Sequence, residues 1–180
     1  MKLHLGCGRR HIPGFIHIDA VDFPHVDHVA AIDNLSFIGD GTVDLIYNCH
    51  VLEHFKRRDV ERVLGEWMRV LKPGGVLRTS VPDFASLCKI YLREEKLDLV
   101  VGALFGRQDY LYNIHYNVFD HATLARSLEK VGFENVKRYD WRQTEHADVD
   151  DYSQAYLPHM DKDNGTLISL NVECSKPLTA

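Results

Sequence analysis

Residues 3–8 read LHLGCG, a short apolar segment that ends in two glycines separated by a single cysteine. This pattern predicts a β-strand followed by a tight turn. Further strand patterns follow at residues 15–19, 26–32, 43–47 and 76–81. Because a helical pattern separates the later strands, the sequence predicts an α/β protein with a mainly parallel sheet.

The clearest helical pattern begins near residue 60. A second, less regular helix is predicted from residue 84 to about residue 105. Asp120 is expected to cap a third helix that stops before Gly132. Late strands at residues 136–141 and 167–174 are expected to pair antiparallel at one edge of the sheet. The first helix presents one apolar face, made by Val60, Val63, Leu64, Trp67, Met68 and Leu71.

The composition is that of a globular chain, with 45% hydrophobic and 26% charged residues among 180. This length predicts a single domain over residues 1–180. No apolar run reaches the ~18–20 residues that span a bilayer, and no secretory signal pattern opens the sequence. We therefore expect a cytoplasmic protein without a membrane partner. The net charge of -5 argues against nucleic-acid binding, and the four dispersed cysteines predict free thiols.

Most of the negative charge falls late in the sequence, between residues 140 and 163. We call residues 145–165 the acidic segment. A solvated loop is one interpretation, but Tyr156, Leu157 and Met160 lie within the segment and are unusually apolar for such a loop. The other interpretation is a lid that closes over a bound ligand and is dispensable for the fold.

Polar and small residues follow each predicted strand, at the sheet edge where α/β proteins bind ligands. Gly6 and Gly8 allow a ligand to approach the backbone closely. Asp19 ends the second strand, where a carboxylate can accept both hydroxyls of a ribose. The residues after the third strand, Asp33 and Leu35, suit the edge of a purine.

Three blocks in this order, LHLGCG at residues 3–8, HVLEH at residues 50–54 and LKPGGVL at residues 71–77, carry a family resemblance. They resemble the class I S-adenosylmethionine-dependent methyltransferases, in the compact branch related to small-molecule methyltransferases. The resemblance implies a Rossmann-like three-layer sandwich with a mostly parallel seven-stranded sheet whose last strand is antiparallel. It also implies S-adenosylmethionine as cofactor and methyl transfer as activity.

The resemblance further implies roles for single residues. Gly6, Cys7 and Gly8 are expected to hold the methionine part of the cofactor, and Asp19 its ribose. The remaining expected cofactor contacts are Asp33 or Leu35 at the adenine, and Cys49 and His50 beside the sulfonium.

An oxygen or nitrogen acceptor can also require a general base. His50, His54, His115 and His159 are candidates for that base, and we favour His54 or His115. The stretch around His115 is a further candidate for the wall of the acceptor pocket. The sequence lacks the Asn-Pro-Pro-Tyr type of motif that is found in amino-group methylators of DNA and protein. We therefore expect a small-molecule acceptor.

The chain departs from the family pattern near its N-terminus. Only residues 9–15 separate Gly8 from the second strand, too few for a crossover with a full helix. Helices near the N-terminus are therefore expected to be reduced. One face of the sheet would then lack cover, which favours a homodimer.

Other interpretations remain. A nicotinamide site would require a third glycine where His11 stands. His50 and His54 have the spacing for one metal on a helix, but no third ligand is evident, so no metal is predicted. A histidine-based metal hydrolase is the weakest alternative. A non-catalytic module that binds S-adenosylmethionine or its product is the main one.

Overall fold

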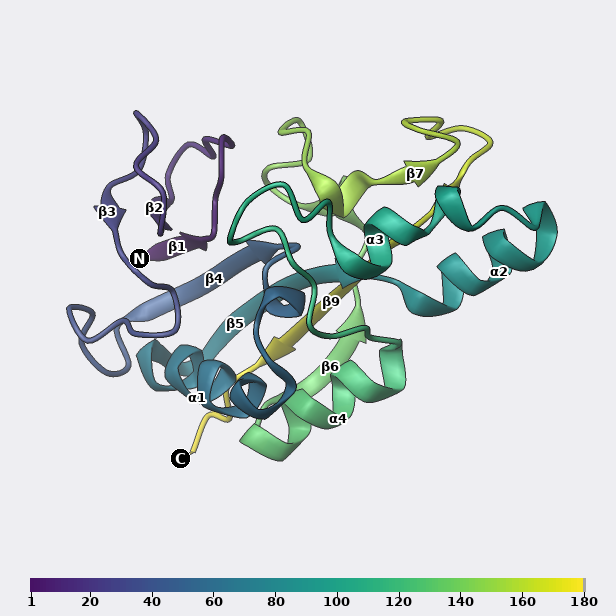
Figure 1. Ribbon diagram of the computed structural model, residues 1–180. Coiled ribbons are helices and arrows are strands. Elements are labelled where there is room, and N and C mark those ends of the chain that lie inside the picture. Colours follow the sequence, from purple (N-terminus) through teal and green to yellow (C-terminus); the bar gives the residue numbers. More distant parts are fainter. Residues whose placement is uncertain (180) are drawn as a thin grey trace.

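The computed structural model describes residues 1–179, whose central element is one twisted sheet (Figure 1). Its strands and the small hairpin beside it are β1 (Lys2–Leu5), β2 (Ile16–Asp19), β3 (His28–Val29), β4 (Val43–Cys49), β5 (Leu71–Pro82), β6 (Glu134–Arg138), β7 (Tyr156–Leu157), β8 (Thr166–Leu167) and β9 (Ser169–Ser175). The α-helices are α1 (Val60–Val70), α2 (Phe84–Glu94), α3 (Val101–Phe105) and α4 (His121–Val131).

The sheet has seven strands in the order β3-β2-β1-β4-β5-β9-β6. Neighbouring strands run parallel from β3 to β5, whereas β9 lies antiparallel between β5 and β6. This arrangement confirms the predicted mostly parallel, Rossmann-like sheet with an antiparallel last strand. The carboxyl ends of β1, β2 and β4 therefore meet at one edge.

One face of the sheet packs against α1 and α4, which lie together below it in Figure 1. Leu3 and Leu5 of β1 and Ile46 of β4 point into this main core and are fully buried. Trp67 of α1 fills its centre and donates its indole N–H to the Ile32 carbonyl at 2.9 Å. The apolar face predicted for this helix is thus the one that covers the sheet.

Within residues 1–179, the opposite face is covered without an α-helix. The chain passes from Gly8 to β2 through turns alone, which confirms the reduced N-terminal helices. The expectation of an uncovered face is nevertheless wrong, because Val149 and His146 from the acidic segment pack there. They cover a second core made of Ile12, Phe15, Leu45 and Tyr47. An uncovered face therefore no longer favours a homodimer.

Polar contacts fix the acidic segment to the sheet. Asp151 is buried, accepts the Tyr47 hydroxyl hydrogen bond at 2.5 Å and accepts the Ser153 N–H at 2.9 Å. Glu145 pairs with Lys2 and Arg78 at 3.0 and 2.6 Å. The first half of the segment thus packs on the sheet, which argues against the expectation that the segment is dispensable for the fold.

Several histidines gather between the sheet and the acidic segment. His4 of β1 is 2% exposed, and the rings of His17, Tyr47 and Phe15 lie around it. Its Nδ1 has no hydrogen-bond partner among residues 1–179. Burial, followed by nearby histidines, lowers the pKa of His4 to about 3. This imidazole is therefore neutral in the folded protein.

Other elements differ from the pattern-based expectations in length. The helix predicted over residues 84–105 is interrupted between α2 and α3, and the strand predicted over residues 26–32 shortens to β3. The Asp120 cap is confirmed: its carboxylate accepts the Thr123 N–H at 2.8 Å. Within the described chain, no helix combines the length and the apolar character needed to traverse a membrane.

Candidate functional site

The turn after β1 is shaped by two glycines. Gly6 and Gly8 have φ values of +64° and +54°, which favour glycine over other residues. A side chain at Gly6 would place its Cβ 2.5 Å from Val51 Cγ2, so only glycine lets the turn pass this close to the segment after β4. Around Gly8, by contrast, no atom of the described chain lies within 4 Å of such a Cβ. The turn therefore has one packed side and one open side.

Asp19 lies at the end of the neighbouring strand and is tied to this turn. Its Oδ2 accepts the Gly8 N–H at 2.8 Å, and its Oδ1 accepts the Val21 N–H at 2.9 Å. The side chain is mostly buried, but each carboxylate oxygen keeps a further lone pair. The expected pair of glycine turn and carboxylate is thus brought together at one edge of the sheet.

Tyrosines from two later segments approach the same place. Burial, followed by the Asp19 carboxylate, raises the pKa of Tyr110. Tyr152, in the acidic segment, places its ring 5.3 Å from that of His50. The sequence indicated an aromatic stretch around Tyr110, but nothing local distinguished Tyr152. For the lid interpretation, the relevant contact of the acidic segment is that of Tyr152 with His50, although the side chains of Tyr152 and His159 are both exposed.

Cys49 is the last residue of β4, and His50 follows it. His50 has a left-handed backbone with φ of +53°, and its Nε2 lies 3.1 Å from Ser169 Oγ. Burial raises the pKa of the Cys49 thiol well above its usual range and that of Cys7 to about 12. Both thiols are therefore protonated at neutral pH.

The residues expected at a purine lie on the other side of the turn, against α1. The Asp33 carboxylate pairs with Arg62 at 2.6 Å and stays partly exposed. The Leu35 side chain is fully buried in the main core, and its N–H donates to Glu66 Oε1 at 2.6 Å. Of the two, only Asp33 keeps a side chain at the surface.

His54 and His115 meet although they are distant in sequence. Their rings form a T-shaped contact at 4.8 Å, beside the fully buried Glu53. Glu53 Oε1 lies 4.0 Å from His115 Nε2 and 3.6 Å from His50 Nδ1. In the sequence, Glu53 stands out only as part of the HVLEH block at residues 50–54. Its spacing from His50 and His54 was the available signal.

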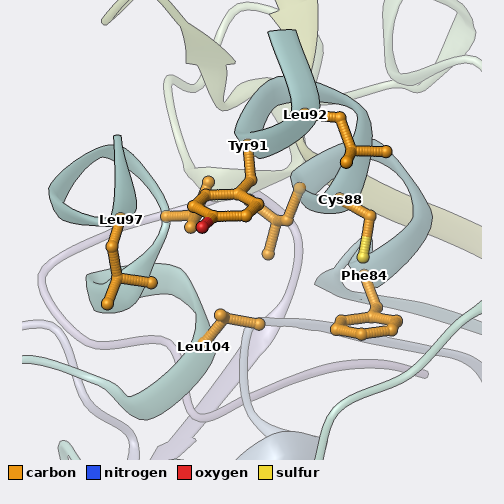
Figure 2. Close-up of a pocket in the computed structure, with 8 residues that line it drawn as sticks. Phe84, Cys88, Tyr91, Leu92, Leu97 and Leu104 are labelled. Atoms are coloured by element: carbon orange, nitrogen blue, oxygen red, sulfur yellow. The ribbon is translucent and has the colours of Figure 1, made fainter. Parts of the chain in front are cut away.

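A separate apolar groove lies along α2 and the chain that leads into α3. Figure 2 shows Phe84, Cys88 and Tyr91 lining it from the helix, with Leu97 and Leu104 opposite. Its lining contains no charged side chain among the described residues. This groove does not suit a charged nucleoside ligand, so the turn at Gly6–Gly8 remains the candidate site.

Comparison with protein-family models identifies one family for this chain. A family model described as "Methyltransferase domain" matches residues 4–138. Comparison with curated protein sequences returns no match.

Solved structures with the same fold are numerous. A SAM-dependent methyltransferase from Archaeoglobus fulgidus superposes with a TM-score of 0.59 at 16% identity, over 97% of this chain and 85% of its own. A SAM-dependent methyltransferase from Methanosarcina mazei superposes with a TM-score of 0.57 at 18% identity, over 98% of this chain and 92% of its own. The 1,6-didemethyltoxoflavin-N1-methyltransferase of Burkholderia thailandensis, with bound S-adenosylhomocysteine, superposes with a TM-score of 0.59 at 16% identity. The superposition covers 98% of this chain and 70% of that enzyme. At these identities the likeness concerns the fold.

Proposed function

This chain belongs to the methyltransferase-domain family, and on that premise we propose that it transfers a methyl group from S-adenosylmethionine to a small-molecule acceptor. One observation carries the proposal. The glycine turn after β1 is tied through the Gly8 N–H to the Asp19 carboxylate at the end of β2. This pair occupies the sheet edge where ligands of α/β proteins bind.

The residues at that edge fit the chemical groups of the cofactor. In this proposal the backbone of Gly6, Cys7 and Gly8 holds the methionine part, and its open side at Gly8 leaves room for it. The free lone pairs of Asp19 accept the ribose hydroxyls. Asp33 contacts the adenine, which would require it to share its carboxylate with Arg62.

The cofactor supplies an activated methyl group on a sulfonium, so the protein contributes mainly position. Cys49 and His50 are the residues that we assign beside it. Because burial keeps the Cys7 and Cys49 thiols protonated, neither competes with the acceptor as a thiolate nucleophile.

A general base is the second requirement for a hydroxyl or amine acceptor. Burial, followed by His54, lowers the pKa of His115 to about 4, and burial also lowers the pKa of His54. Both imidazoles are therefore neutral and able to accept a proton, and the base role of either one stays a prediction. A small acceptor is supported by the net charge of -5, which disfavours a polyanionic substrate.

Calorimetric titration with S-adenosylhomocysteine tests the proposal. We expect a dissociation constant in the micromolar range, about −8 kcal/mol, and far weaker binding of NAD. Asp19→Asn keeps an oxygen for one of the two backbone N–H groups and loses the charge. It should weaken binding by roughly 1–3 kcal/mol, whereas Asp22→Asn, on a neighbouring exposed side chain, should not change it.

Equal affinity in the wild type and in Asp19→Asn would contradict the assigned ribose contact. Binding that is confirmed, but without methyl transfer in a screen of small hydroxyl and amine acceptors, would instead favour the non-catalytic module. NAD binding tighter than that of S-adenosylhomocysteine would refute the cofactor assignment.

A further inference from the structure

The carboxylate of Glu53 is buried beside two histidine rings. Its side chain is 0% exposed, and neither oxygen has a hydrogen-bond partner among the described residues. His50 Nδ1 lies 3.6 Å and His115 Nε2 lies 4.0 Å from its Oε1. An ionised carboxylate in such a place is strongly unfavourable unless a cation or a proton accompanies it.

The hydrogen bonds of each histidine fix which nitrogen carries its proton. His54 Nδ1 lies 3.1 Å from the Ile114 carbonyl, and His115 Nδ1 lies 2.9 Å from the Ala103 carbonyl. Each Nδ1 must therefore donate its N–H, which leaves Nε2 with a free lone pair. An imidazole held in this way by a backbone carbonyl is typical of metal ligands.

A chain of hydrogen bonds fixes His50 as well. Asn171 donates its amide N–H to the Ser153 carbonyl at 2.9 Å, so its Oδ1 faces Ser169. The Ser169 hydroxyl donates to that oxygen and accepts from His50 Nε2. His50 Nδ1 is then unprotonated and faces the Glu53 carboxylate. The Nδ1 lone pair of His50 and the Nε2 lone pair of His115 thus both lie near the Glu53 carboxylate.

The backbone holds these groups in place. The Glu53 carbonyl accepts the N–H groups of Tyr116 and Asn117 at 2.8 and 3.2 Å. Asn117 also donates its side-chain amide to the Phe55 carbonyl at 2.5 Å. The segment that contains His115 is therefore fastened to the turn that contains Glu53 and His54, independently of any ligand.

We propose that Glu53, His54 and His115 bind a divalent transition-metal ion, with Zn²⁺ as the first candidate. One ligand atom from each residue lies within 4.8 Å of the others. Ligand atoms around tetrahedral Zn²⁺ are about 3.4 Å apart, given bonds of about 2.0–2.2 Å. Small side-chain rotations therefore suffice to close the site.

The ligand set also indicates the kind of ion and site. Two imidazoles and one carboxylate suit Zn²⁺, Fe²⁺ or Mn²⁺ better than Mg²⁺ or Ca²⁺, which prefer oxygen ligands. Three protein ligands leave at least one position open for water or a substrate atom. Metal binding would occupy the lone pairs that His54 or His115 needs as a general base, so the two roles exclude each other.

The test measures metal directly. Untagged protein is stripped with a chelator and titrated with ZnCl₂ by calorimetry, and the metal content is measured after dialysis. We expect one equivalent per chain in the wild type. Glu53→Gln and His115→Gln should weaken binding by more than roughly 100-fold, since even the loss of outer partners of a ligand costs 10–100-fold. His159→Asn, on an exposed side chain, should not affect binding.

Two further measurements keep the outcome unambiguous. Glu53→Gln is expected to fold, because its amide can donate to the histidines that now face the carboxylate. Circular dichroism checks this. The Co²⁺-loaded wild type should lack a thiolate charge-transfer band, because no cysteine is in the proposed ligand set.

Absence of stoichiometric Zn²⁺ binding, wild-type affinity in both variants, or a thiolate band would each overturn the proposal. In the first case, higher thermal stability of Glu53→Gln would identify Glu53 as a buried neutral acid. The metal site does not depend on the proposed cofactor, so the titration with S-adenosylhomocysteine can succeed or fail separately.

Discussion

Replacement of His4 by leucine should make the protein less sensitive to acid. His4 is buried with an unpaired Nδ1, and burial together with the nearby His17, His146, His25 and His11 lowers its pKa from 6.5 to about 3. A lowered pKa means that the unfolded chain takes up a proton that the folded chain refuses. The contribution of neutral His4 to the unfolding free energy is therefore fully present above pH 6.5 and is lost as the pH falls toward 3.

The size of the effect follows from those two pKa values. When the pH falls from 7.5 to 5.0, protonation of His4 in the unfolded chain lowers the unfolding free energy by about 2 kcal/mol. For a domain of this size that corresponds to a drop in melting temperature of about 4–8 °C. Leucine has a similar volume and no proton to gain, so His4→Leu should lose about 2 kcal/mol less than the wild type over the same range.

Urea denaturation of both proteins at a series of pH values measures this difference. His50 and His115 are also buried and titrate alike in both proteins, so they cancel in the comparison. Parallel curves of unfolding free energy against pH would refute the reasoning. They would mean that His4 is solvated or paired in a way that lets it ionise in the folded state.

Two further predictions concern the packing of the acidic segment and the cap of α4. Asp151→Ala removes the buried partner of the Tyr47 hydroxyl and should lower the unfolding free energy by roughly 1–3 kcal/mol. The change is measured by urea denaturation, and a loss below the experimental error would mean that the segment is not fixed to the sheet. Asp120→Ala removes the N-cap and should lower the unfolding free energy by about 0.5–2 kcal/mol. Ser127→Ala on the same helix should change stability less, and an equal loss in both variants would contradict the capping role.

The elements that could be predicted from sequence are those with local signals. The strand before Gly6, the helix beginning at Val60 and the Asp120 cap all depend on patterns within a few residues, and the structure confirms each. The Gly8–Asp19 pair was also accessible, because parallel strands bring their carboxyl ends to one edge.

The remaining features depend on contacts between distant residues. Tyr47 and Asp151 are 104 positions apart, and no periodicity of either segment indicates that they meet. An apolar residue after a strand can face a ligand or the core, and Leu35 faces the core. The contact of His54 with His115 likewise requires the fold of the chain between them.

The cover that the acidic segment gives to β1 and β4 has a consequence for the order of folding. During synthesis the first four strands emerge long before residue 151, so the ring of Tyr47 and its neighbours stay exposed until the last quarter of the chain appears. The antiparallel strand β9 also arrives last, although it belongs between β5 and β6. Contacts of such long sequence separation slow folding. They also leave apolar surface of the nascent N-terminal half exposed to aggregation until the C-terminal residues pack on it.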